Sequence, residues 1–182
     1  MWWRSHQQSW DQRRLVVFDE TALNTKMARI YGRSAVGERC LCKVPHGHWQ
    51  TSTFIAALRF DRIDAPFLIG GSANGEVFAA YVGQVFCPEL NAGDIVILDN
   101  LCIHKTDAVA RLIEARGASV RYLPPYSPDL NPEMAFAKLK SHMREAAART
   151  LEDLQLSLAE SLTPFESAHR QGFSKHAQYA TN

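Results

Sequence analysis

Three acidic residues stand at positions that suit a metal site for phosphodiester cleavage. Asp19 ends the apolar run 15–18, and Asp99 ends a similar run, 95–98. A third acid, Glu133, lies between a proline-rich loop and a helical pattern. Carboxylates that crowd together repel one another unless a cation lies between them, and oxygen ligands favour Mg²⁺ or Mn²⁺ over zinc. The three acids therefore predict a divalent-metal site that cuts phosphodiesters.

The runs before the two aspartates predict neighbouring strands. Each run is a short block of consecutive large apolar residues, which is typical of a strand buried on both faces. If the two strands are parallel and adjacent, Asp19 and Asp99 emerge at one sheet edge, where open α/β sheets usually bind ligands. Glu20 should point to the face opposite Asp19, because side chains alternate along a strand, and it is interpreted as structural rather than as a fourth ligand.

The rest of the chain predicts an α/β protein, with strands first and helices later. Further strands are expected at 41–44, 53–60, 67–69 and 120–123, and two glycines, Gly32 and Gly37, indicate a hairpin. Helices are expected after an Asn74 N-cap, before a Gly117 stop, after Pro132 and after a Thr150–Asp153 capping box. The segment between 95 and 123 then forms a strand-helix-strand unit with a right-handed crossover.

Length, charge and cysteine usage narrow the class of protein. The 182 residues, 46% of them hydrophobic, suffice for one sizeable core and one domain. A net charge of +1 is a weak argument against DNA binding, which normally shows as a basic excess. The N-terminus lacks the pattern of a signal peptide, and no apolar stretch approaches the roughly 18 residues of a membrane span. A cytoplasmic protein with no membrane partner and with reduced, structural cysteines is expected.

Four segments together resemble one family. They are Phe-Asp-Glu-Thr at 18–21, Val-Pro-His-Gly-His-Trp at 44–49, Leu-Asp-Asn at 98–100 with His104 and Lys105, and Leu-Pro-Pro-Tyr-Ser-Pro-Asp-Leu-Asn-Pro at 123–132. The combination resembles the catalytic domain of bacterial insertion-sequence transposases in the mariner-like branch of the DDE superfamily of endonucleases, and it runs from about residue 15 to the C-terminus.

The resemblance implies a fold, a reaction and a set of partners. The fold is α/β and ribonuclease H-like, with a mixed central sheet of about five strands flanked by helices. The reaction is DNA cleavage and strand transfer during transposition of an insertion sequence, with Asp19, Asp99 and Glu133 as catalytic triad and as ligands of two Mg²⁺ (or Mn²⁺) ions. The implied partners are transposon-end and target DNA, and a second protein copy in a homodimer or a dimer with full-length transposase. The implied location is the bacterial cytoplasm, at the nucleoid.

The resemblance also implies a domain division and DNA contacts. Residues 1–14 are expected to be a remnant linker, in which the tryptophans either mark a linker helix or anchor on the domain. Residues 15–182 are then the catalytic domain, without the N-terminal helix-turn-helix region that such transposases carry. The residues expected to contact DNA are Asn100, His104, Lys105, Lys138 and Lys140, and those near helix starts gain from backbone N–H groups that favour anions.

One departure from the family pattern bears on activity. Such transposases usually have one more apolar residue between the proline and the glutamate, whereas Glu133 follows Pro132 directly. A slip of one residue would turn the helix by about 100° and move it by 1.5 Å, which is enough to carry the carboxylate off the metal. The alternative is therefore a truncated or decayed transposase domain that binds DNA, or pairs with full-length transposase, without cutting.

Two further interpretations remain. Aspartates at the ends of paired strands also occur in phosphatases, so a hydrolase of small phosphate esters is the rival enzyme. A zinc site could be formed by Cys40, Cys42, His46 and His48, but their spacings fit zinc motifs poorly. This segment is interpreted instead as a turn near DNA.

Overall fold

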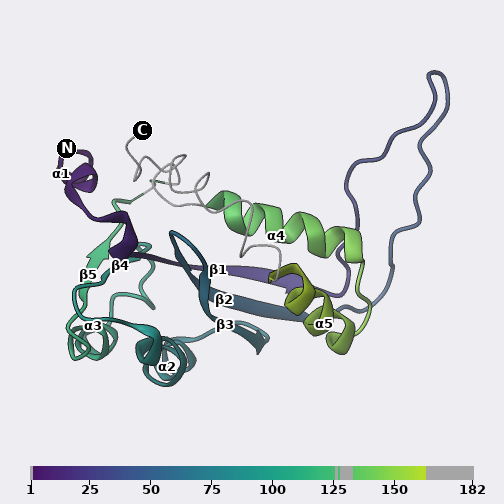
Figure 1. Cartoon of the computed structure of the whole chain (residues 1–182). Coiled ribbons are helices and arrows are strands. Elements are labelled where there is room, and N and C mark those ends of the chain that lie inside the picture. The colour runs from purple at the N-terminus through teal and green to yellow at the C-terminus, as the bar shows by residue number, and fades with distance from the viewer. Residues whose placement is uncertain (1, 126, 128–132, 163–182) are drawn as a thin grey trace.

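One mixed sheet of five strands forms the centre of the protein, as expected (Figure 1). The computed structural model describes residues 2–125, 127 and 133–162. The strands are β1 (Leu15–Asn24), β2 (Thr51–Arg59), β3 (Ile63–Gly70), β4 (Ile95–Leu98) and β5 (Ser119–Tyr122). Their order across the sheet is β3-β2-β1-β4-β5. β2 runs antiparallel to both of its neighbours, β1 and β3, whereas β1, β4 and β5 run parallel to one another.

Helices cover both faces of the sheet. They are α1 (Trp2–His6), α2 (Gly75–Tyr81), α3 (Asp107–Glu114), α4 (Glu133–Ala146) and α5 (Leu151–Leu162). Short helical turns span Gln7–Ser9, Gln12–Arg14, Val82–Phe86 and Cys87–Glu89. Figure 1 shows α2 and α3 on one side of the sheet and α4 on the other. None of the helices in the described part of the chain has the length and apolar character that crossing a bilayer requires.

The sheet residues divide between the two faces by simple alternation. Val16 and Phe18 of β1 pack against α2 and α3 in the largest apolar cluster. Leu23 of β1 points to the opposite face, where it packs with Phe54 and with the buried side of α4 and α5. On the α2 and α3 side, Val109 and Ile113 of α3 are buried, whereas Leu112 is 38% exposed.

The expected caps are present at three helix ends. The side chain of Asn74 accepts a hydrogen bond from the N–H of Val77, and that of Thr150 accepts one from the N–H of Asp153. Gly117 follows α3 with a φ of +75°, a left-handed conformation that glycine adopts without strain. β4, α3 and β5 therefore form the predicted strand-helix-strand unit.

The N-terminal segment packs on the domain. Trp3 is 6% exposed and belongs to an apolar cluster with Leu15, Val17 and Ile97. Its ring meets the ring of Trp10 edge to face, with 5.2 Å between centroids. Of the two interpretations of the tryptophans, the structure supports anchoring for this pair.

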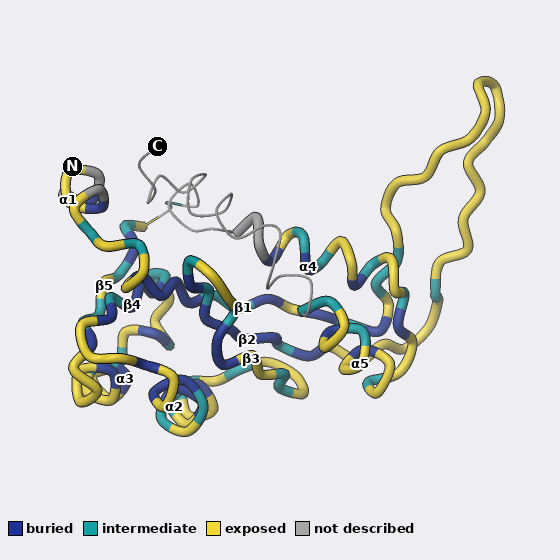
Figure 2. The backbone as a smooth tube through the Cα atoms, in the orientation of Figure 1, coloured by how far each residue is buried: buried dark blue, intermediate teal, exposed yellow. Residues whose placement is uncertain are grey.

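The predicted strand at 41–44 and the hairpin at Gly32 and Gly37 are wrong. The chain between β1 and β2 runs out and back as an extended loop with almost every residue exposed (Figure 2). Leu41 and Val44 are 84% and 64% exposed. β1 already pairs with β2, up to Asn24↔Thr51, and with β4 on its other side, so this segment cannot pair with β1. An isolated hairpin is only marginally stable in water.

A network of buried ion pairs lies at the end of the sheet where β1 begins. The guanidinium of Arg59, whose side chain is 4% exposed, forms ion pairs with Asp64 and, at 2.7 Å, with Asp94. It also donates to the carbonyl of Glu89 at 3.0 Å. Asp64 takes a further bond from Arg62, whose side chain is 46% exposed. Every buried charge in this network has a partner.

Replacing the central cation should therefore destabilise the fold strongly. Arg59→Leu leaves two buried carboxylates without their partner, and we expect it to lower the free energy of unfolding by about 3–5 kcal/mol. Arg62→Leu removes a half-exposed partner and should cost less than about 1 kcal/mol. Urea unfolding of both variants measures the difference. Equal losses would show that the network does not depend on the buried arginine.

Candidate metal centre

The register of β1 and β4 places Asp19 and Asp99 at the same level. Val17 pairs with Ile97 in the parallel ladder, and each aspartate lies two residues further along its strand direction. β1 lies between β2 and β4 in the middle of the sheet. The structure therefore brings the two acids to one edge, at the carboxyl ends of adjacent parallel strands.

Asp19 is held within a continuous strand. Its pairing partner on β2 is Ala56, and its Oδ1 accepts a hydrogen bond from the N–H of Glu20 at 2.9 Å. By alternation it shares a face with Val17 and Leu23, which is the face that α4 covers. Its backbone cannot shift without breaking the pairing with β2, which continues on both sides of it along the strand, so its position is rigid.

Asp99 lies just beyond the end of β4 and is oriented by two donors. The N–H of Leu101 donates to its Oδ1 at 3.0 Å, and Nδ1 of His104 contacts the same oxygen. Burial raises the pKa of Asp99, but the bonds from His104 and Leu101 outweigh burial and hold that pKa below its usual range. Asp99 is therefore ionised at neutral pH, as a metal ligand must be.

Glu133 is the first residue of α4, but its side chain lies outside what the structure describes, as do residues 128–132 of the loop before it. The described part of α4 fixes the direction of the helix. Phe136, one turn after Glu133, packs against Phe54 with 6.1 Å between ring centroids. Phe54 pairs with Thr21, two residues from Asp19. The first turn of α4 therefore lies over the part of β1 that carries Asp19.

Glu20 points away from Asp19, as expected, but it is not an ordinary surface acid. It lies on the α2 and α3 side of the sheet, and its Oε2 is buried with no hydrogen-bond partner among the described residues. Nε2 of His104 lies 3.9 Å from Oε2 of Glu20. Burial raises the pKa of Glu20; His104 lowers it and Asp99 raises it to smaller extents. The carboxyl of Glu20 therefore lies next to His104, the residue that contacts Asp99.

His104 is buried, whereas a residue that contacts DNA must be exposed. Its side chain is 1% exposed and lies between Asp99, Glu20 and the rings of Phe18 and Phe78. α3 begins only at Asp107, so the ring does not lie at a helix start. No phosphate can reach an imidazole in this position. The Asp99–His104 contact was not predicted, although an aspartate that accepts from the N–H two residues later is a known turn former.

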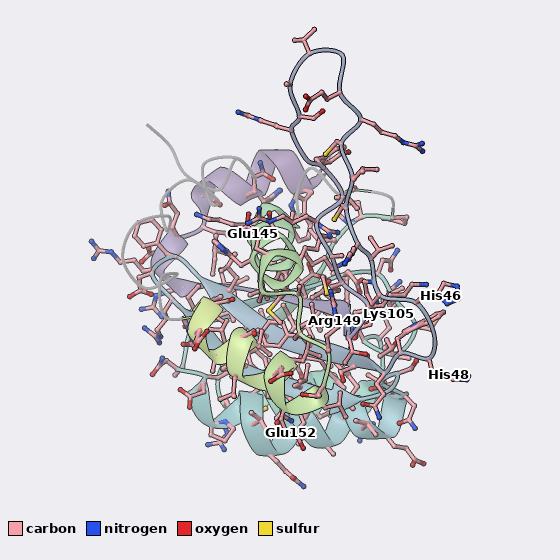
Figure 3. The ribbon with its side chains drawn as sticks, turned by 90° about the vertical axis from the view of Figure 1, so that its right-hand side faces the viewer. His46, His48, Lys105, Glu145, Arg149 and Glu152 are labelled. Atoms are coloured by element: carbon pink, nitrogen blue, oxygen red, sulfur yellow. The ribbon has the colours of Figure 1, made fainter. Side chains whose placement is uncertain are left out.

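The remaining residues expected at DNA are more accessible. Asn100 is partly buried beside Asp99, and Lys105 is exposed. Lys138 and Lys140 are partly buried on α4. Arg149 follows α4 and donates to the carbonyls of Thr25 and Met27 at the base of the extended loop (Figure 3).

The residues of the zinc interpretation all lie in the extended loop. Cys40, Cys42, His46 and His48 are exposed, and the two histidines project from the returning half of the loop (Figure 3). Within residues 2–125, 127 and 133–162, side chains of undescribed placement excepted, no three His, Cys, Asp or Glu side chains form a group that could hold a metal ion.

Neutralising Glu20 should stabilise the protein at neutral pH. Because burial raises the pKa of Glu20, its ionised form costs stability in the folded state, and that cost disappears as the pH falls toward the unfolded pKa of about 4.3. We expect Glu20→Gln to raise the free energy of unfolding at pH 7. Urea unfolding from pH 7 to pH 4 should show this gain shrinking, and a gain independent of pH would contradict the cause given.

Mos1 transposase chains share the fold, which is ribonuclease H-like. The mariner Mos1 paired-end complex with Mg matches with a TM-score of 0.70 and 15% identity, over 96% of this chain and 54% of that chain. The paired-end complex with the left transposon end matches with a TM-score of 0.66 and 17% identity, over 96% and 54%. The Mos1 catalytic domain alone matches with a TM-score of 0.63 and 15% identity, over 96% and 80%.

The chain thus spans about half the length of the transposase chains in the paired-end complexes, at 54%. A comparison with curated proteins finds no match. The family model described as "DDE superfamily endonuclease" matches residues 14–155, which include Asp19, Asp99 and Glu133. This match covers most of the chain and both central strands. The chain belongs to the DDE superfamily of endonucleases.

Proposed function

We propose that this chain is a transposase catalytic domain that cleaves DNA strands and transfers them during transposition of an insertion sequence. The observation that carries the proposal is the parallel register of β1 and β4, which brings Asp19 and Asp99 level at one edge of the sheet. The Mos1 complexes hold transposon-end DNA, and others were solved with Mg or Mn. Both partners are proposed for this chain by that likeness.

The donor set fits a hard divalent cation. Asp99 uses Oδ1 for two hydrogen bonds and keeps Oδ2 clear of donors from the described residues. Asp19 and Asp99 would hold two Mg²⁺ or Mn²⁺ ions together with Glu133 from α4. When bound, such ions supply Lewis-acid activation of the attacking and the leaving oxygen. The protein's own contribution is to hold charged oxygens at fixed positions, on a central strand and on a hydrogen-bonded turn.

The exposed and partly exposed basic residues near this edge would bind the DNA backbone. Lys105 lies in the turn after Asp99, and Lys138 and Lys140 lie on α4, which covers the face of Asp19. Asn100 is next to Asp99 and would orient the scissile strand. The net charge of +1 is then no obstacle, because the acids of the metal site offset basic residues that act locally.

Joining two transposon ends also requires two catalytic centres in one complex. We therefore expect a homodimer, or a dimer with full-length transposase, at the DNA; in a bacterium that is the nucleoid in the cytoplasm. The competing function is a domain that binds DNA without cutting, and the short loop before Glu133 favours it. Cleavage by the purified protein separates the two.

Cleavage should depend on both aspartates and on the metal. We expect the protein to nick supercoiled plasmid in Mg²⁺, and EDTA to abolish nicking. Asp19→Asn and Asp99→Asn should each lower the rate at least about a thousandfold, because bound metal contributes several kcal/mol to the transition state. DNA affinity in a gel-shift assay should stay within about threefold of the unchanged protein.

A matched control is Asp107→Asn, since the side chain of Asp107 is 92% exposed on α3. This variant should nick at the full rate. Plasmid that is shifted in mobility but never cut would establish the non-cutting alternative. Full-rate cleavage by Asp99→Asn would rule out the proposed metal site.

The salt dependence of DNA binding tests the lysines. Each phosphate contact that is lost should lower the slope of log affinity against log salt concentration by about 1. We expect this change for Lys105→Gln and for Lys140→Gln, measured by fluorescence anisotropy. Arg13→Gln, an exposed change before β1 at the opposite edge, should leave the slope unaltered. If all three substitutions changed the slope equally, DNA binding would depend on the total charge of the protein and not on where the lysines lie.

A further inference from the structure

We propose that His104 is the positioning residue of Asp99: its imidazole holds Oδ1 of the carboxylate, so that Oδ2 is presented to the cation. This inference rests on the proposed function, because it assumes that Asp99 is a metal ligand. It assigns to a buried histidine a role other than contact with DNA or with the metal.

The contact itself has a defined direction. A carboxylate can only accept hydrogen bonds, so Nδ1 of His104 carries the proton that it shares with Oδ1 of Asp99. The N–H of Leu101 donates to the same oxygen at 3.0 Å. Two donors on Oδ1 fix the rotation of the carboxyl group. Oδ2 takes no hydrogen bond from the described residues and is left for a cation.

The imidazole is held more firmly than the carboxylate that it orients. Its ring packs against the ring of Phe78, with 4.4 Å between centroids, and against Phe18 at 5.9 Å. The N–H of His104 donates to the carbonyl of Leu101 at 3.1 Å, and its own carbonyl accepts from the hydroxyl of Tyr122 at 3.4 Å. The ring therefore cannot turn away from Asp99 without disturbing the apolar core.

His104 contacts Asp99 from the face of the sheet that does not carry Asp19. Phe18 and Glu20 lie on the α2 and α3 face of β1, and Asp19 lies on the face that α4 covers. His104 thus supports Asp99 from the face opposite Asp19. A histidine that served as a ligand would have to approach from the side of the metal.

The second ring nitrogen of His104 faces another acid. Nε2 of His104 and Oε2 of Glu20 are both buried without hydrogen-bond partners among the described residues, and they face each other at 3.9 Å. Glu20 thus stands behind the imidazole as a second acid. The outer-shell contact that orients the ligand is therefore the hydrogen bond from Nδ1 to Asp99, and loss of such contacts typically weakens metal binding 10- to 100-fold.

The test compares two replacements that differ in one donor. His104→Asn keeps an amide N–H near the position of Nδ1, whereas His104→Leu fills similar space without a donor. The probe is Mn²⁺ alone, and its affinity for the whole chain is measured by electron paramagnetic resonance. The signal that Asp99→Asn removes identifies the site. His142→Leu, an exposed change on α4, is the matched control.

We expect His104→Leu to weaken Mn²⁺ binding about 10- to 100-fold. His104→Asn and His142→Leu should stay within about threefold of the unchanged protein. Thermal unfolding of each variant separates positioning from folding. Unchanged Mn²⁺ affinity in folded His104→Leu, or an equal loss in folded His104→Asn, would overturn the proposal.

A second measurement needs no substitution. Long-range ¹⁵N–¹H spectra of the unchanged protein should show the proton of His104 on Nδ1, and they decide the question if His104→Leu does not fold. A proton on Nε2 alone would overturn the proposal. A protein that binds Mn²⁺ as expected but never nicks plasmid would refute the proposed cleavage and leave the role of His104 supported; absence of Mn²⁺ binding would refute both.

Discussion

The parallel pairing of β1 with β4 is the constraint on which the candidate site depends. These two strands come from distant parts of the chain, and their register, Val17↔Ile97, sets Asp19 and Asp99 level. A shift of one residue would turn every side chain of one strand to the other face. The apolar clusters on both faces oppose such a shift, so the core that stabilises the fold also aligns the two acids.

The buried charged groups at the two ends of the strands differ in how completely they are hydrogen-bonded. At the edge where β1 begins, the guanidinium of Arg59 satisfies Asp64 and Asp94, and the network is closed. At the other edge, Oε2 of Glu20 and Nε2 of His104 are buried without partners among the described residues. Unsatisfied polar groups cost stability, and this pair lies directly beside Asp99, a placement typical of a functional site.

Local patterns predicted the elements that depend on nearby residues. The β1 and β4 runs, the caps at Asn74 and Thr150 and the stop at Gly117 all follow from short-range chemistry, and each is present. The strand expected at 41–44 failed because pairing is a property of the sheet: β2 had already taken the edge of β1. Apolar residues in that loop therefore remain exposed.

The sequence by itself determined which residues could form a site: two aspartates after buried strands, a glutamate at a helix start and the opposite orientation of Glu20. Strand alternation and helix caps act over a few residues, so sequence reasoning reaches them. Only the tertiary structure decided that His104 lies under Asp99 rather than on the surface. That outcome depends on how the turn after β4 packs against Phe18 and Phe78, which come from elements far away along the chain.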